Sequence, residues 1–181
     1  MAKSSTIYKV ELQVSDLDRH YYQTHVLTVA QHPSETEQRM MVRILAFALN
    51  ASEYLAFTKG LSTDEVPDLW EKTLTGDIQH WIEIGQPSAK RVKKACNNSA
   101  KVSIYTFSGH SAAVWQQQNI ADFNRQPKLN IIDFPTQKIK ELGKLVARNM
   151  SLQCTIQDGL IWFGDAQNNI EITPVIWQDN A

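Results

Sequence analysis

Two short segments of the sequence each combine a carboxylate and a tryptophan in a pattern typical of an extended strand. In residues 81–85, Trp-Ile-Glu-Ile-Gly, alternation puts Glu83 on the face opposite to that of the two isoleucines. In residues 66–70, Asp68 and Trp70 share a face if the segment is extended. An acid within an apolar strand costs free energy unless it is paired, hydrogen-bonded or bound to a metal. Asp68 and Glu83 are therefore the first candidates for chemistry.

A basic helix is predicted directly after Glu83. Residues 88–98 have helical spacing, and their apolar stripe begins at Val92. This leaves four basic residues at the edges and on the outer face of the helix, namely Lys90, Arg91, Lys93 and Lys94. Basic groups within two turns of a strand carboxylate could neutralise a phosphate or polarise a water molecule.

A Pro-Asp pair, an acid on the next strand and then a lysine outline metal-dependent cleavage of phosphodiester bonds. Asp68 and Glu83 would hold Mg²⁺ through oxygen. The ion would activate water and bind the scissile phosphate, and lysine would supply charge or handle a proton. Structural roles are open alternatives: an ion pair of Glu83 with Lys93 or Lys94, a turn at Asp68, or a solvated lysine face.

Other common chemistries of α/β proteins have little support in the sequence. The seven glycines, at positions 60, 76, 85, 109, 143, 159 and 164, form neither Gly-x-Gly-x-x-Gly nor a P-loop. No Gly-x-Ser-x-Gly elbow and no His-x-x-x-His pair occurs. Cys96 and Cys154 match neither a disulfide framework nor a zinc motif, so we expect reduced, buried thiols.

The elements that would position these residues can be read from hydrophobic periodicity. Alternation predicts an N-terminal hairpin of residues 6–14 and 25–29, and a C-terminal hairpin of 152–157 and 160–163 around Asp158-Gly159, a type I′ turn signal. Between them, apolar strands alternate with helices: strands at 80–85, 102–107 and 129–134, helices at 88–98, 112–119 and 136–149. We expect an α/β fold in which helices flank one mixed sheet.

A further helix is predicted between residues 34 and 50. Met40, Met41 and Ile44 recur at helical spacing, so one face should enter the core. Ser34, as the N-cap, and Glu37 three residues later fit a capping box.

Composition indicates one domain over residues 1–181, because the chain has an ordinary hydrophobic fraction of 43% and no linker or break. The longest apolar run, 44–49, is too short to span a membrane, and no signal peptide is visible. We therefore expect a cytoplasmic protein with no membrane partner. The formal charge of −1 argues against indiscriminate nucleic-acid binding but is compatible with a local basic groove.

Three segments taken together carry a resemblance to a known family. They are residues 32–41, residues 81–87 leading to 93–96, and residues 157–162. With residues 6–9 and 16–19, they strongly resemble the YaeQ family of small bacterial proteins, over essentially the whole chain.

This resemblance implies a variant of the PD-(D/E)XK, restriction-endonuclease-like fold. By position, Asp68 would be the first acid of the motif, Glu83 the second, and Glu35 an additional catalytic acid on the first helix. An acid in the first turn of a helix is favourable there in any case, so Glu35 also has a structural alternative.

The sequence departs from the motif at Gly85, where the family pattern would have a lysine two residues after the second acid. Superfamily members are known in which this lysine has moved to a neighbouring helix. Lys93 or Lys94 would then complete the catalytic set, and Lys90 and Arg91 would contact nucleic acid.

Two functions compete on this basis. The first is a Mg²⁺-dependent nuclease or phosphodiesterase that acts on DNA or RNA. The second is a non-catalytic module that binds nucleic acid or protein and retains the nuclease-like fold, which Gly85 and the near-neutral charge favour. We place the first slightly ahead, and neither fixes an oligomeric state.

Overall fold

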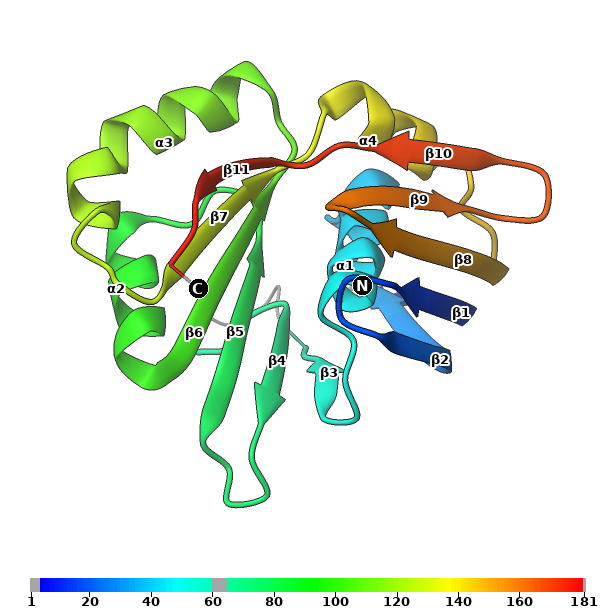
Figure 1. Cartoon of the computed structure of the whole chain (residues 1–181), viewed down its shortest axis with the longest axis horizontal. Helices are drawn as coiled ribbons and strands as arrows, with labels where there is room; N and C mark the ends of the chain where they lie inside the picture. Colours follow the sequence, from blue (N-terminus) through cyan, green and yellow to red (C-terminus); the bar gives the residue numbers. More distant parts are fainter. Residues whose placement is uncertain (1–3, 60–64, 181) are drawn as a thin grey trace. The chain divides into compact units, whose positions relative to one another are not determined.

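The computed structural model describes residues 4–59 and 65–180, which form four helices and eleven strands (Figure 1). These elements fall into two compact units. The first comprises residues up to Ala51 together with Gln137–Pro174, and the second comprises Ser52–Thr136 together with the segment from Val175. Each unit contains its own mixed sheet. The mixed α/β class is confirmed, whereas the expectation of one mixed sheet is wrong; a single domain spanning the chain stays a prediction.

The sheet of the first unit joins the two predicted hairpins, both of which are confirmed. Its strand order is β10-β9-β8-β1-β2. Only the pair β1–β8 is parallel, and it aligns Leu12 with Leu152. Both are buried, so this long-range pairing rests on apolar packing. The strands are β1 (Thr6–Asp16), β2 (Tyr21–Gln31), β8 (Asn149–Gln157), β9 (Leu160–Gly164) and β10 (Asn169–Ile172).

The β8–β9 turn has the predicted type I′ geometry. Asp158 and Gly159 have φ values of 51° and 75°, and this turn requires positive φ at both positions. The Asp18 carboxylate accepts the amide hydrogens of Asp158 (2.7 Å) and Gly159 (2.9 Å), so the turn between β1 and β2 holds the turn between β8 and β9.

Helix α1 (Glu37–Asn50) packs on β1 and β8, and not on the sheet expected from the sequence. Its N-cap is Thr36, whose side chain accepts the Arg39 amide at 3.1 Å. The capping box of Ser34 and Glu37 is therefore wrong. The Ser34 hydroxyl lies 2.7 Å from His32 Nδ1, and the Glu35 amide donates to the His32 carbonyl, so residues 32–35 form a turn before the helix.

Helix α4 (Thr136–Gly143) is shorter than the predicted helix over 136–149. A Cβ atom at Gly143 would lie 2.9 Å from Cγ of Gln38, so the absence of a side chain permits this close approach. The chain then turns, with amide hydrogen bonds from Lys144 to Glu141 and from Leu145 to Leu142. Asn149 already belongs to β8.

The second unit has a six-stranded sheet in the order β11-β7-β6-β5-β4-β3. Its centre, β5–β6–β7, is parallel, and the outer pairs are antiparallel. The three strands predicted at 80–85, 102–107 and 129–134 therefore belong to one sheet, as expected. The strands are β3 (Leu55–Phe57), β4 (Leu69–Lys72), β5 (Ile78–Ile84), β6 (Ser99–Thr106), β7 (Leu129–Asp133) and β11 (Val175–Gln178).

Helices α2 (Ala89–Asn98) and α3 (His110–Phe123) connect the parallel strands and cover one face of this sheet (Figure 1). The core between them includes Trp81 from β5, Val92 from α2 and Trp115 from α3. Cys96 is buried in this cluster and Cys154 lies buried in the first unit, and both are free thiols.

Within the part of the chain that is described, no helix has the length and apolar character to cross a membrane.

The capping assignment can be tested with two alanine variants. We expect Thr36→Ala to lower the free energy of unfolding by about 1 kcal/mol, because the Arg39 amide loses its acceptor. Ser34→Ala is the matched control and should cost less, since its hydroxyl bonds an adjacent side chain at the surface. Urea denaturation measures both, and a larger cost for Ser34→Ala would contradict the assignment.

A second prediction concerns His80, a buried residue of β5 whose Nε2 lies 2.7 Å from Ser103 Oγ. Burial, and secondarily the charge of Lys101, lowers the pKa of His80 from 6.5 to about 4. The folded state favours the neutral ring, so this contribution to stability is present above pH 6.5 and is lost as the pH falls towards 4.

The expected loss is about 3 kcal/mol. Urea denaturation between pH 7 and pH 4 should show a flatter acid limb for His80→Gln than for the unmodified protein. His110→Gln, at an exposed position, serves as the control. Parallel acid limbs for the unmodified protein and His80→Gln would overturn the prediction.

Candidate functional site

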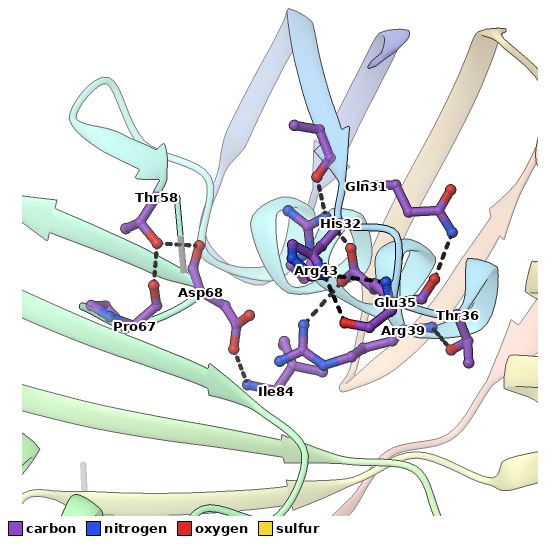
Figure 2. Close-up of polar contacts among 12 residues, drawn as sticks. Gln31, His32, Glu35, Thr36, Arg39, Arg43, Thr58, Pro67, Asp68 and Ile84 are labelled. Carbon is purple, nitrogen blue, oxygen red and sulfur yellow. Dashed lines mark hydrogen bonds and ion pairs between the residues drawn. The ribbon is translucent and has the colours of Figure 1, made fainter. Parts of the chain in front are cut away.

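Asp68 bonds to the main chain on both sides of Glu83. The β4–β5 ladder pairs Leu69 with Ile82, and Asp68 precedes this pair. The Asp68 amide donates to the Ile82 carbonyl at 3.1 Å, and Asp68 Oδ2 accepts the Ile84 amide at 2.8 Å (Figure 2). The two predicted acids therefore come from neighbouring strands at the end of one ladder, and their role as metal ligands stays a prediction.

The Pro67–Asp68 segment is held in place by Thr58, which follows β3. The Thr58 amide donates to the Asp68 carbonyl at 3.1 Å, and its hydroxyl donates to the Pro67 carbonyl (Figure 2). Asp68 is 5% exposed. The segment is thus fixed by main-chain hydrogen bonds at a bend just before β4, which begins at Leu69, and the structural role of Asp68 as a turn residue stays an alternative.

Glu83 is a buried carboxylate with two donors on one oxygen. Its Oε1 accepts Trp81 Nε1 at 2.9 Å and Arg91 Nε at 2.7 Å. Burial raises the pKa of Glu83, and the negative charge of Asp68 raises it further, whereas Arg91 and the Trp81 hydrogen bond lower it. Burial prevails, so the ionised form is less favourable in this site than in water.

The second oxygen of Glu83 has no donor among the described residues, since every hydrogen bond of this side chain ends on Oε1. Ser52 Oγ is the one buried side-chain polar atom without a partner in the described part of the chain. Glu83 Oε2 therefore keeps some accessible surface, consistent with the 8% exposure of its side chain. An oxygen in this position can accept a cation.

Arg91 lies next to Glu83, where Lys93 or Lys94 was predicted. Helix α2 begins after Ser88, whose hydroxyl accepts the Arg91 amide at 3.2 Å. From this first turn the guanidinium reaches Glu83 and also donates to the Val66 carbonyl at 2.9 Å. The ion-pair partner of Glu83 is thus Arg91.

The lysines of α2 are placed differently. Lys94 Nζ bonds Glu65 Oε1 at 2.9 Å, in a pair whose side chains are 42% and 77% exposed. Lys90 and Lys93 are exposed and form no ion pair within the described residues. The structure therefore brings Asp68 and Glu83 together with Arg91, and it does not bring Lys93 or Lys94 onto the Glu83 carboxylate.

Glu35 belongs to the first unit and precedes α1, so it is not the first-turn acid expected from the sequence. Its Oε1 accepts Arg39 Nη1 (3.0 Å) and Arg43 Nε (2.8 Å), and its Oε2 accepts Arg43 Nη2 (2.7 Å), as Figure 2 shows. The side chain has no exposed surface. This arrangement is typical of a structural ion cluster, and the catalytic assignment of Glu35 stays a prediction.

Trp81, which bonds Glu83, was not among the predicted site residues, and Arg91 was predicted to contact nucleic acid and not to pair with Glu83. The signal for Trp81 was present, because alternation puts it on the same strand face as Glu83. For Arg91 the signal was ambiguous, because the sequence does not show which of the four basic residues of α2 the rotation of the helix turns towards Glu83.

Within the described residues no group of three or more His, Cys, Asp or Glu could hold a metal.

This combination defines a mixed α/β protein of two sheets and four helices, with a buried pair of acids beside a helix arginine. The chain belongs to the YaeQ family: the family model described as YaeQ protein matches residues 1–174. The YaeQ proteins of Escherichia coli K12 and Salmonella typhi are each 40% identical to it over 178 residues, covering 98% of both chains.

Two crystal structures of YaeQ proteins have the same fold. The protein from Xanthomonas axonopodis pv. citri is 42% identical, with a TM-score of 0.94 over 97% of this chain and 99% of its own. That from Pseudomonas syringae is 35% identical, with a TM-score of 0.93 over 97% of each chain. The predicted family is thereby confirmed.

The dominance of Arg91 over the α2 lysines can be tested by titration. We expect Arg91→Gln and Trp81→Phe each to raise the pKa of Glu83 further, because each removes a group that favours the ionised carboxylate. Lys93→Gln is the control, at an exposed position of the same helix. Carbon-detected NMR of the Glu83 carboxyl measures the shift, and a larger effect of Lys93→Gln would refute the assignment.

Proposed function

We propose that this protein is a Mg²⁺-dependent phosphodiesterase that acts on nucleic acid in the cytoplasm, with a variant restriction-endonuclease-like site. The observation that supports it best is the pair of buried acids, Asp68 and Glu83, with an open oxygen on Glu83 and a guanidinium at the same carboxylate. An acid with a raised pKa next to a second acid and a cation is a recurrent feature of functional sites.

The donor set suits Mg²⁺ and other metals that prefer oxygen ligands better than metals that prefer nitrogen or sulfur. Mg²⁺ keeps several waters and is usually held by one or two carboxylates together with substrate phosphate oxygens. Asp68 and Glu83 would supply these two carboxylates. When bound, the ion would lower the pKa of a coordinated water and neutralise charge on the scissile phosphate.

Arg91 would then take the role of the missing lysine. Gly85, where the motif has lysine, has a φ of 107° and donates its amide to the Tyr105 carbonyl at 2.9 Å. A lysine there would be strained, because side chains rarely adopt this backbone conformation. The guanidinium of Arg91 is a planar group with several donors that can bind a phosphate oxygen.

A non-catalytic module remains the second candidate, and one specific observation favours it. The Trp81–Glu83–Arg91 contacts, with Arg91 also bonded to Val66, form a connected network that can serve as structure alone. In that case the site would order the start of α2 and the chain would bind nucleic acid or protein without cleaving it.

Metal binding provides the first test. Mg²⁺ or Mn²⁺ at a hundred times its Kd should raise the free energy of unfolding by about 2.7 kcal/mol. Glu83→Gln and Asp68→Asn should abolish this gain, whereas Glu65→Gln, at an exposed acid paired with Lys94, should retain it. Affinity should rise with pH through the raised pKa of Glu83, because only the ionised carboxylate binds the metal.

Cleavage separates the two candidates. The purified protein should cut single-stranded DNA, duplex DNA or RNA only with Mg²⁺ or Mn²⁺, and Glu83→Gln prepared in parallel should be inactive. Metal binding without cleavage of any of these substrates would support the non-catalytic module. Cleavage that survives Glu83→Gln would exclude the proposed site.

A further inference from the structure

Strand β2 forms an edge of the first unit's sheet, and it is the only long edge strand among the described residues. It has 11 residues, whereas the three other edge strands, β3, β10 and β11, have 3, 4 and 4. Natural sheets keep exposed edges short, or interrupt them with charged residues or proline, because unpaired main-chain groups attract another strand. Residues 21–31 contain no proline, lysine, arginine, aspartate or glutamate.

The main-chain groups that face the free edge can be identified from the hydrogen bonds of β1. The amides of Lys9 and Leu17 donate to carbonyls at the β8 side. The main-chain amides and carbonyls of odd-numbered β1 residues therefore point to β8, and those of even-numbered residues point to β2. Because β1 pairs Leu12 with His25, the odd-numbered residues of β2 bond to β1. The even-numbered residues of β2 therefore direct their amides and carbonyls outwards.

One of these outward groups already has a partner. The Ala30 carbonyl accepts Arg43 Nη2 at 2.8 Å, which closes that end of the edge. The remaining outward-facing residues are Tyr22, Thr24, Val26 and Thr28, and all four are exposed. Val26 is 82% exposed and Tyr22 is 56% exposed, which leaves apolar surface along the same edge.

We propose that two copies of this chain associate through β2, in an antiparallel, two-fold symmetric pair that continues the sheet from one protomer into the other. A register centred on His25 uses all four outward-facing residues and leaves Ala30 to Arg43. It sets Tyr22 opposite Thr28 of the second copy and Thr24 opposite Val26. The two-fold axis repeats each of these two pairs, so four pairs with two hydrogen bonds each give about eight hydrogen bonds.

The side chains support this self-complementary register. Tyr22 against threonine and Thr24 against valine are cross-strand pairs of aromatic and β-branched residues, which stabilise antiparallel sheets. Pairing of the two β2 strands brings no like charges together, because β2 contains no lysine, arginine, aspartate or glutamate. Helix α1 packs mainly on β1 and β8, and it reaches β2 through Arg43 at Ala30 and Phe47 at the ring of His25.

Sedimentation and light scattering test the association. The unmodified 181-residue chain should show a concentration-dependent dimer of twice the 20.6 kDa chain mass. Val26→Lys and Val26→Pro should each raise the dimer Kd by about tenfold or more, because they add edge charge or remove an outward amide. Proline is tolerated on an edge strand, and Val26→Lys tests the same point if Val26→Pro fails to fold.

Ser151→Lys is the matched control, because it adds the same charge at an exposed position of the central strand β8. It should leave the dimer intact. A monomer at every concentration of the unmodified protein would overturn the proposal. So would a dimer that tolerates both Val26 variants.

The register has its own test in cysteine cross-linking. In the register centred on His25, the two copies of residue 25 form a pair that is not hydrogen-bonded, with Cα atoms roughly 4.5 Å apart. That distance permits a disulfide. His25→Cys should cross-link into a dimer under mild oxidation, whereas Val26→Cys should not. The natural thiols Cys96 and Cys154 are buried and should not interfere. Cross-linking at position 26 instead of 25 would overturn the register.

Discussion

The buried carboxylate of Glu83 is the constraint on which the centre of the second unit depends. A charge within an apolar strand must be compensated by groups that reach it from other elements. Trp81 supplies a donor from the same strand face, and Arg91 supplies an opposite charge from the helix that follows. The position of the first turn of α2 is thereby linked to the chemistry of β5.

Several local features hold Arg91 in that position. The Ser88 hydroxyl caps α2 through the Arg91 amide, so the arginine is anchored by its main chain as well as its side chain. The Pro87 carbonyl, just before the cap, accepts Trp115 Nε1 from α3 at 2.8 Å. The two helices that cover the sheet thus share one anchoring point. A basic residue elsewhere on α2 lacks this support and extends into solvent, as Lys93 does.

Much of the fold followed from the sequence because its signals are local. Alternation predicted both hairpins, and positive φ at Asp158 and Gly159 agrees with the turn signal. The division into two sheets was missed, because it depends on the parallel pairing of β1 with β8, which are far apart in sequence. The candidate site was predicted in part. Strand patterns indicated Asp68 and Glu83, whereas the pairing of Arg91 with Glu83 depends on the rotation of α2 about its axis, which the sequence does not show.

Glu35 and Glu83 show how the same chemistry leads to two different outcomes. Both carboxylates are buried and bound by arginine. At Glu35, guanidinium groups occupy both oxygens, and the side chain has no exposed surface, so the charge is compensated within the protein. At Glu83, donors occupy only one oxygen, and a neighbouring acid opposes ionisation. An incompletely compensated carboxylate gains most from an external cation, which makes Glu83 the better candidate for a metal ligand.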